Sequence, residues 1–225
     1  MHISFIVPIY NERNTIEALV NSIRENCTGH TLQIVLIDDG STDDSTDVIN
    51  TIARDHSDIE GVQFEKNKGK TVALSKGFSM AEGDVVITMD ADLQDDPQEI
   101  PRFLVAFENG SDLVCGWKSL RRDPLRRRIL SRIYNGFVGM VFGLPLHDIN
   151  CGFKAMRLDV ARSLDLRHDY HRLIPVLAAQ NGYRLSEIQV KHHARRHGKS
   201  KYGMERYWKG LRDVGRLWWE IQKDR

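Results

Sequence analysis

The chain has 225 residues, which is enough for one α/β domain with a sizeable core, and its net charge is +1. It holds no run of about 18 apolar residues and no basic leader, so we expect neither a membrane-spanning helix nor a signal peptide. The charge is unevenly distributed, because residues 1–115 hold 8 basic and 21 acidic residues (net −13), whereas residues 116–225 hold 24 and 10 (net +14).

Strands and helices alternate through the first half of the chain. The predicted strands are apolar runs rich in β-branched residues, and they cover residues 3–9, 32–37, about 61–65, 84–89 and 112–115. Helices are predicted between them from apolar residues at helical spacing, and they begin near residues 15, 43, 70 and 97. This alternation favours right-handed crossovers and an α/β fold with a mostly parallel sheet flanked by helices.

Three of these strands end in polar or acidic loops, which we expect at one exposed rim of the sheet. The loops are Pro8-Ile9-Tyr10-Asn11-Glu12, Asp38-Asp39-Gly40-Ser41 and Asp90-Ala91-Asp92. Two carboxylates one residue apart repel each other unless a cation lies between them. A hard divalent ion that also holds substrate phosphates is the usual solution. The alternative for each loop is an ordinary solvated turn or helix start.

In this order and at these intervals, the three loops resemble those of the family-two glycosyltransferases, which have the Rossmann-like GT-A fold. The resemblance implies a nucleotide-sugar site made of Pro8, Tyr10, Glu12, Ile37, Asp39, Asp90, Ala91 and Asp92. It also implies that a divalent cofactor, Mg²⁺ or Mn²⁺, is held by Asp90, Asp92 and Gln94.

The loop Asn67-Lys68-Gly69-Lys70 opens a predicted helix and could approach a phosphate. It lacks the GxxxxGK[ST] spacing of a nucleotide-triphosphate loop, so we reject an ATPase function. A phosphate contact and a solvated helix start are equally compatible with these residues.

The character of the chain changes after the fifth strand. Residues 118–132 hold seven lysines and arginines against one acid, and residues 133–146 are apolar nearly all round. The apolar stretch is either a buried core helix or a helix at a membrane interface. Residues 204–225 are predicted to form an amphipathic helix that either packs on the domain or lies at that interface. We therefore expect a catalytic domain over 1–203, followed by a C-terminal helix over 204–225.

Two later motifs narrow the resemblance. The stretches Asp148-Ile149-Asn150-Cys151-Gly152-Phe153-Lys154 and RRHGKSKY (195–202) resemble the polyprenyl-phosphate branch, which includes dolichyl-phosphate mannose synthases and bacterial undecaprenyl-phosphate transferases. The likeness covers residues 1 to about 203. It implies a catalytic set made of Asp92, Lys118, Arg127, Ser131, Arg195 and Lys201. Lys118 stands where the family usually has Arg, which keeps the charge but gives up bidentate geometry, and a surface lysine is the alternative.

The resemblance implies transfer of a mannose- or glucose-type sugar, from GDP-mannose or a UDP-sugar, to dolichyl or undecaprenyl phosphate with inversion. A lipid phosphate has its second pKa near ~6 and is already nucleophilic at neutral pH, so this acceptor needs no general base. Cationic side chains and a metal would offset the repulsion between the two anionic substrates.

Two other functions remain possible from the residues. A cytosolic transferase with a hydroxyl acceptor would require a carboxylate base, for which Asp95 and Asp96 are the candidates. A nucleic-acid-binding module could use the basic run, but the aromatic residues accompany apolar segments rather than an exposed stacking platform, so we expect no nucleic acid.

Three scattered cysteines fit a reducing cytosol, and we expect a peripheral protein on the cytoplasmic face of a membrane.

Overall fold

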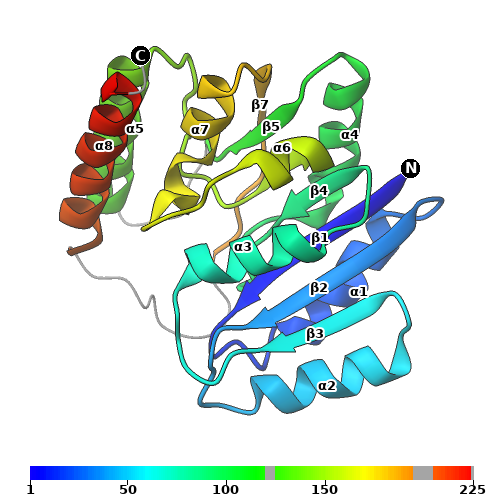
Figure 1. The fold of residues 1–225 in the computed structure, drawn as a ribbon. Coiled ribbons are helices and arrows are strands. Elements are labelled where there is room, and N and C mark those ends of the chain that lie inside the picture. Colours follow the sequence, from blue (N-terminus) through cyan, green and yellow to red (C-terminus); the bar gives the residue numbers. More distant parts are fainter. Residues whose placement is uncertain (120–124, 195–204, 224–225) are drawn as a thin grey trace.

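The computed structural model describes residues 1–119, 125–194 and 205–223, with the side chains of 125–127 and 205–207 outside that description. Within this part, seven strands form one sheet in the order β3-β2-β1-β4-β6-β5-β7 (Figure 1). The strands are β1 (His2–Ile9), β2 (Thr31–Asp38), β3 (Ile59–Gln63), β4 (Val85–Thr88), β5 (Leu113–Trp117), β6 (Lys154–Arg157) and β7 (Leu185–Gln189). Only β6 runs antiparallel to its described neighbours, which confirms the predicted mostly parallel sheet.

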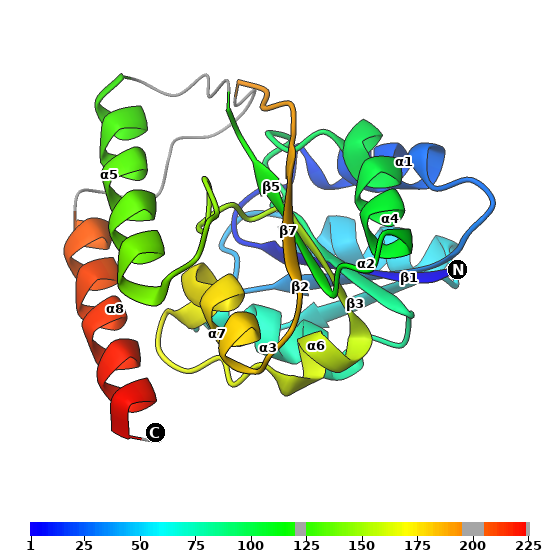
Figure 2. The same ribbon diagram turned by 90° about the horizontal axis from the view of Figure 1, so that it is seen from above.

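Helices cover both faces of the sheet (Figure 2). One face carries α1 (Ile16–Asn26), α2 (Ser45–Asp55) and α4 (Ile100–Glu108), the last preceded by the 3₁₀ turn η1 (Pro97–Glu99). The other face carries α3 (Lys70–Met80), α6 (Leu158–Ser163) and α7 (Ile174–Gln180), the last preceded by η2 (Tyr170–Leu173). The long helices α5 (Leu125–Phe142) and α8 (Glu205–Lys223) lie side by side and pack on the η2–α7 segment.

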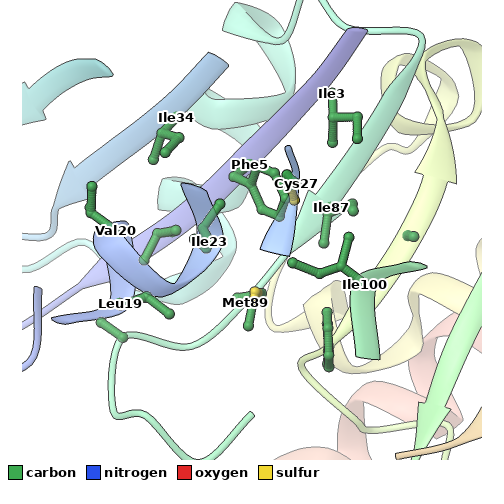
Figure 3. Packing of buried hydrophobic residues seen from close by; sticks show 14 of the residues in the cluster. Ile3, Phe5, Leu19, Val20, Ile23, Cys27, Ile34, Ile87, Met89 and Ile100 are labelled. Carbon is green, nitrogen blue, oxygen red and sulfur yellow. The ribbon is translucent and has the colours of Figure 1, made fainter. Parts of the chain in front are cut away.

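The core has a layer on each side of the sheet, because successive side chains of a strand point to opposite faces. Phe5 of β1 packs with Ile23 of α1 and Ile100 of α4 on one face, as Figure 3 shows. Ile6 points to the other face, where it meets α3. A Cβ added at Gly77 of α3 would overlap Ile6, so this glycine lets the helix lie close to the sheet.

Two strands escaped prediction, and one was misplaced. β6 has only four residues (KAMR) and no alternating pattern, and hydrogen bonds to strands on both sides hold it in the sheet. β7 is a partly buried edge strand with the polar sequence LSEIQ. β3 begins two residues earlier than expected, at Ile59. These are the elements whose formation depends most on neighbouring strands.

Candidate active site

The predicted site loops gather because β1, β2 and β4 are parallel and end at the same edge of the sheet. In the register of the sheet, Ile9 pairs with Asp38 and Lys154 pairs with Thr88. Because β6 is antiparallel, the motif that precedes it lies beside the end of β4 and next to Asp90. The topology therefore brings the DxxCGFK motif, residues 148–154, to the acidic loop after β4.

Asp90 lies among basic side chains. Its Oδ1 accepts a hydrogen bond from the Nζ of Lys70, and its side chain is 37% exposed. Burial raises the pKa of Asp90, but the charges of Lys70 and Lys118 outweigh this and lower the pKa to about 2. The carboxylate is therefore ionised throughout the physiological pH range and is available to a cation.

Gly152 explains why residues 148–154 matter to this carboxylate. A Cβ at this position would lie 2.9 Å from Asp90 Oδ2, so only glycine leaves room for the carboxylate in its present place. The flanking residues fix the segment: the Phe153 ring packs against Phe103 with centroids 4.4 Å apart, and Lys154 Nζ donates to the Cys151 carbonyl. The segment therefore packs against Asp90 and limits where its carboxylate can lie.

Asp92 is buried, with 7% of its surface exposed, so the expected exposed rim position is wrong for this residue. The loop bends back at Leu93, whose φ of 57° lies in the left-handed region. Gln94 then exchanges hydrogen bonds with His193, which donates its N–H to the Gln94 carbonyl at 2.9 Å. The segment around His193 is therefore hydrogen-bonded to the loop. Ala91 is buried as well.

Lys118 is not a surface lysine. Its Nζ lies 2.6 Å from Asp95 Oδ1, and the two side chains are 10% and 0% exposed. Burial lowers the pKa of Lys118, but the charge of Asp95, with smaller contributions from Cys151 and Asp90, raises it above its usual value. The lysine is therefore charged at physiological pH, and its ammonium is paired with the carboxylate of Asp95.

The two loops predicted to hold the nucleoside are joined to each other. Asn11 donates its N–H to Ser41 Oγ at 2.9 Å, and its Oδ1 accepts from the Thr42 N–H at 2.7 Å. Pro8 lies beside Ile37 in the sheet register, and Tyr10 and Glu12 are partly exposed on the first loop. The side chain of Ile37 is fully buried in the core, so a ligand could reach this residue only through its backbone.

Asp39 links the second loop to the start of α3. Its buried carboxylate accepts the N–H groups of Lys68 at 2.7 Å and Gly69 at 2.9 Å. Burial raises the pKa of Asp39, and these two hydrogen bonds lower it in part. Gly40, with a φ of 70°, packs so closely on the backbone of Lys66 that a Cβ would overlap it. The predicted nucleoside residue Asp39 and the loop before Lys70 are therefore one connected unit.

Three predicted residues cannot be compared with the structure: Arg195, Lys201 and the side chain of Arg127 lie outside the described residues. Ser131 is buried on α5.

Two residues with contacts at the site, Asp148 and His171, were not predicted to belong to it, and the sequence left open whether the loop that ends at Lys70 contacts a phosphate. Asp148 accepts hydrogen bonds from Asn135 Nδ2 at 3.1 Å and from the Lys118 N–H at 3.4 Å, which ties α5 to the end of β5. The aspartate was visible in the DxxCGFK motif, but its role was not.

His171 reaches the site from a distant part of the chain. Its Nδ1 lies 2.7 Å from the Oγ1 of Thr71, the second residue of α3. Burial, followed by the charges of Lys70 and Arg172, lowers the pKa of His171 well below its usual value, so the ring is neutral at pH 7. A hundred residues separate the two partners, and no local pattern marks the histidine.

The donor set fits a divalent ion shared with a substrate. In the described residues, no group of three or more His, Cys, Asp or Glu side chains is arranged to hold a metal. Asp90 and Asp92 provide carboxylate oxygens, the donors that Mg²⁺ and Mn²⁺ prefer, and such ions commonly fill their remaining positions with water and substrate phosphates. Two carboxylates are therefore compatible with a metal ion that is shared with a substrate diphosphate.

Comparisons with known proteins agree with this geometry. The sequence profile described as Glycosyl transferase family 2 matches residues 4–165. The chain belongs to this family. It is 38% identical over 205 residues to the undecaprenyl-phosphate 4-deoxy-4-formamido-L-arabinose transferase of Edwardsiella ictaluri, covering 90% of this chain and 63% of the relative. It is 34% identical over 223 residues to the dodecaprenyl-phosphate galacturonate synthase of Rhizobium johnstonii, covering 95% and 65%.

Both relatives are named for polyprenyl phosphates, the acceptors of the branch that the sequence resembles, and the chain spans slightly less than two thirds of their length. Among solved structures, glucosyl-3-phosphoglycerate synthase from Mycobacterium tuberculosis in complex with phosphoglyceric acid superposes with a TM-score of 0.74 at 20% identity, covering 98% of this chain and 79% of that one. Its complex with Mn²⁺, UDP and phosphoglyceric acid gives a TM-score of 0.69 at 20% identity, covering 98% and 75%. The GT-A fold is thereby confirmed.

Proposed function

We propose that this chain transfers a sugar from a nucleotide sugar to a polyprenyl phosphate at a membrane surface, with inversion at the anomeric carbon. Membership of glycosyl transferase family 2 and the undecaprenyl- and dodecaprenyl-phosphate relatives support this proposal. The observation that favours a phosphate over a hydroxyl acceptor is the engagement of both candidate bases, Asp95 and Asp96.

A hydroxyl acceptor needs a general base within reach of its proton. The carboxylate of Asp95 is fully buried and paired with Lys118. Asp96 is 11% exposed, its Oδ1 accepts the Gln98 N–H at 3.0 Å, and its Oδ2 lies 3.0 Å from His193 Nε2. Neither carboxylate is placed to take a proton from a sugar. A lipid phosphate, largely dianionic at pH 7, does not need them.

The chemistry is a single displacement. An oxygen of the acceptor phosphate forms a bond to the anomeric carbon while the bond from that carbon to the diphosphate oxygen breaks, and the nucleoside diphosphate leaves with the electron pair. Lys70 places positive charge in a partly exposed ion pair with Asp90, where it would reduce the repulsion between two anionic substrates. A metal held by Asp90, Asp92 and Gln94 would stabilise the charge of the leaving diphosphate. Arg127, Arg195 and Lys201 remain the predicted contacts of the acceptor and the diphosphate.

The test is a transfer assay. The purified chain is incubated with undecaprenyl phosphate, Mg²⁺ or Mn²⁺, and one of four labelled donors: GDP-mannose, UDP-glucose, UDP-galacturonate or UDP-4-deoxy-4-formamido-L-arabinose. The last two are included because the relatives are named for those sugars. We expect label in the organic phase and an inverted anomeric configuration by NMR. Label that reaches only water-soluble hydroxyl acceptors, or a retained configuration, would contradict the proposal.

The membrane location is supported by the outer sides of α5 and α8. On α5, Ile133 is 63% and Met140 is 76% exposed, whereas Tyr134 and Val138 on the opposite side are buried. On α8, Trp208 and Trp219 are 76% and 67% exposed. Apolar side chains on one side of a helix, with basic residues nearby, are typical of helices that lie in the membrane interface. In the described part of the chain, no helix is long and apolar enough to cross a membrane.

Liposome sedimentation tests this location. The variants Ile133→Asp and Trp208→Asp should each lower binding to anionic vesicles, and added salt should weaken the binding of the wild type because it screens the basic residues. Val105→Asp is the matched control, since Val105 is 53% exposed on α4, on another part of the surface. If Ile133→Asp and Trp208→Asp bind as the control and the wild type do, α5 and α8 do not contact the bilayer.

A further inference from the structure

The loop at residues 67–70 delivers a lysine to the acidic loop after β4. Lys70 is the first residue of α3, and its Nζ donates a hydrogen bond to Asp90 Oδ1. The side chain of Lys70 is 20% exposed and that of Asp90 is 37% exposed, so the ion pair is partly open to solvent. A ligand can therefore reach both members of the pair.

We propose that Lys70 is a ligand of the donor diphosphate, and that its ammonium leaves Asp90 for the diphosphate when metal and nucleotide bind. The inference rests on the proposed function and extends it to a residue in the loop whose role the sequence left open. A divalent ion bound to Asp90 would lie about 2 Å from a carboxylate oxygen. It would repel the ammonium that already contacts the same carboxylate, so binding of the ion favours release of the lysine.

The backbone that carries Lys70 is held on both sides, so only the side chain has to move. On one side, the buried carboxylate of Asp39 accepts the Gly69 N–H at 2.9 Å. On the other side, Thr71 Oγ1 lies 2.7 Å from His171 Nδ1. A lysine has a flexible stem and an ammonium with three N–H donors, and both properties suit an exchange between a carboxylate and phosphate oxygens.

The exchange predicts effects of opposite sign when the ammonium is removed. Metal alone should bind more tightly, because Asp90 loses a competing cation. A nucleoside diphosphate with metal should bind more weakly, because one charge-assisted partner of the diphosphate is lost. A lysine that only neutralises Asp90 would give the first effect without the second, and a lysine with a purely structural role would give neither.

The experiment compares wild type with Lys70→Met, Lys70→Arg and Lys76→Met. Lys76 is an exposed lysine on the same helix, about 9 Å further along its axis, so its replacement removes the same charge away from the site. Free Mn²⁺ is followed by electron paramagnetic resonance, and binding of UDP and of GDP in the presence of Mn²⁺ is measured by calorimetry. For Lys70→Met we expect Mn²⁺ alone to bind at least about threefold more tightly and the nucleotide about 10- to 100-fold more weakly. Lys70→Arg should retain most of the nucleotide affinity, and Lys76→Met should match the wild type.

Each outcome separates this inference from the proposed function. If Lys70→Met binds the nucleotide as tightly as the wild type, or binds Mn²⁺ alone no more tightly, the exchange is refuted while the donor site stands. If the wild type binds neither UDP nor GDP, both proposals fail. If Lys70→Met does not fold, as judged by circular dichroism, the same titrations on Lys70→Gln decide. The transfer assay with undecaprenyl phosphate is independent of these binding measurements.

Discussion

Replacing Lys118 with methionine tests whether this lysine stabilises the fold by pairing with Asp95 or contacts the substrate. The resemblance places Lys118 in the catalytic set, whereas the structure pairs it with Asp95 at 2.6 Å, with side-chain exposures of 10% and 0%. Removing one partner of such a buried pair leaves an uncompensated charge and costs about 3–5 kcal/mol. For a domain of this size, each kcal/mol lowers Tm by roughly 2–4 °C. We therefore expect Lys118→Met to lower Tm by roughly 6–20 °C.

The assays are thermal melting and urea denaturation of wild type, Lys118→Met, Asp95→Leu and the double variant. The double variant should recover much of the loss, because replacing both charges by apolar groups removes the unpaired carboxylate. A loss below about 1 kcal/mol for Lys118→Met, the size expected of a solvent-exposed pair, would refute the reasoning. A variant that keeps its stability but loses transfer activity would show that Lys118 contacts the substrate instead.

Three further predictions concern Gly152, the buried cysteines and His171. Gly152→Ala should weaken Mn²⁺ binding about tenfold with little change in Tm, because the added Cβ would lie 2.9 Å from Asp90 Oδ2 and displace only the carboxylate. Unchanged Mn²⁺ binding would contradict this prediction. Cys27, Cys115 and Cys151 are buried, and burial raises the pKa of Cys115 and of Cys151 to about 12, so a thiol reagent at pH 8 should label none of them until urea unfolds the chain. The pKa of His171 is lowered in the folded state, so its stabilising contribution is complete above about pH 6.5 and is lost as the pH falls; the urea midpoint should drop more between pH 7 and pH 5 in the wild type than in His171→Gln.

The elements that could be predicted are those whose residues carry their own signal. β1, β2 and β4 are apolar on both faces and were found close to their observed limits, and the loops that follow them were expected at one edge of the sheet. β6 and β7 could not be predicted, because a four-residue strand and a polar edge strand depend on the strands beside them. The long helix α5 was visible as a basic run followed by an apolar run, but the choice between core and interface needed its buried and exposed sides.

The contacts within the site were less predictable than its location. Asp90 and Asp92 were both expected to be exposed, but Asp92 is buried, and the loop that carries it is hydrogen-bonded through Gln94 to His193, about 100 residues later. The pairing of Lys118 with Asp95 likewise depends on how the end of β5 meets the loop after β4. Sequence spacing shows which strand ends carry charge, but the partners of each charge depend on the tertiary packing.

The ion pairs made by Asp90 and Asp95 balance the charge within the candidate site. Lys70 belongs to the acidic half of the chain and Lys118 lies just inside the basic half, and together with Asp90 and Asp95 they form a group of four side chains without net charge. Metal alone would add two positive charges beside two lysines, and a diphosphate alone would add negative charge beside Asp90 and Asp92. A metal–diphosphate pair leaves the balance almost unchanged. The site therefore favours the two ligands together, and the affinity for Mn²⁺ should rise in the presence of the nucleotide by the same factor as the reverse.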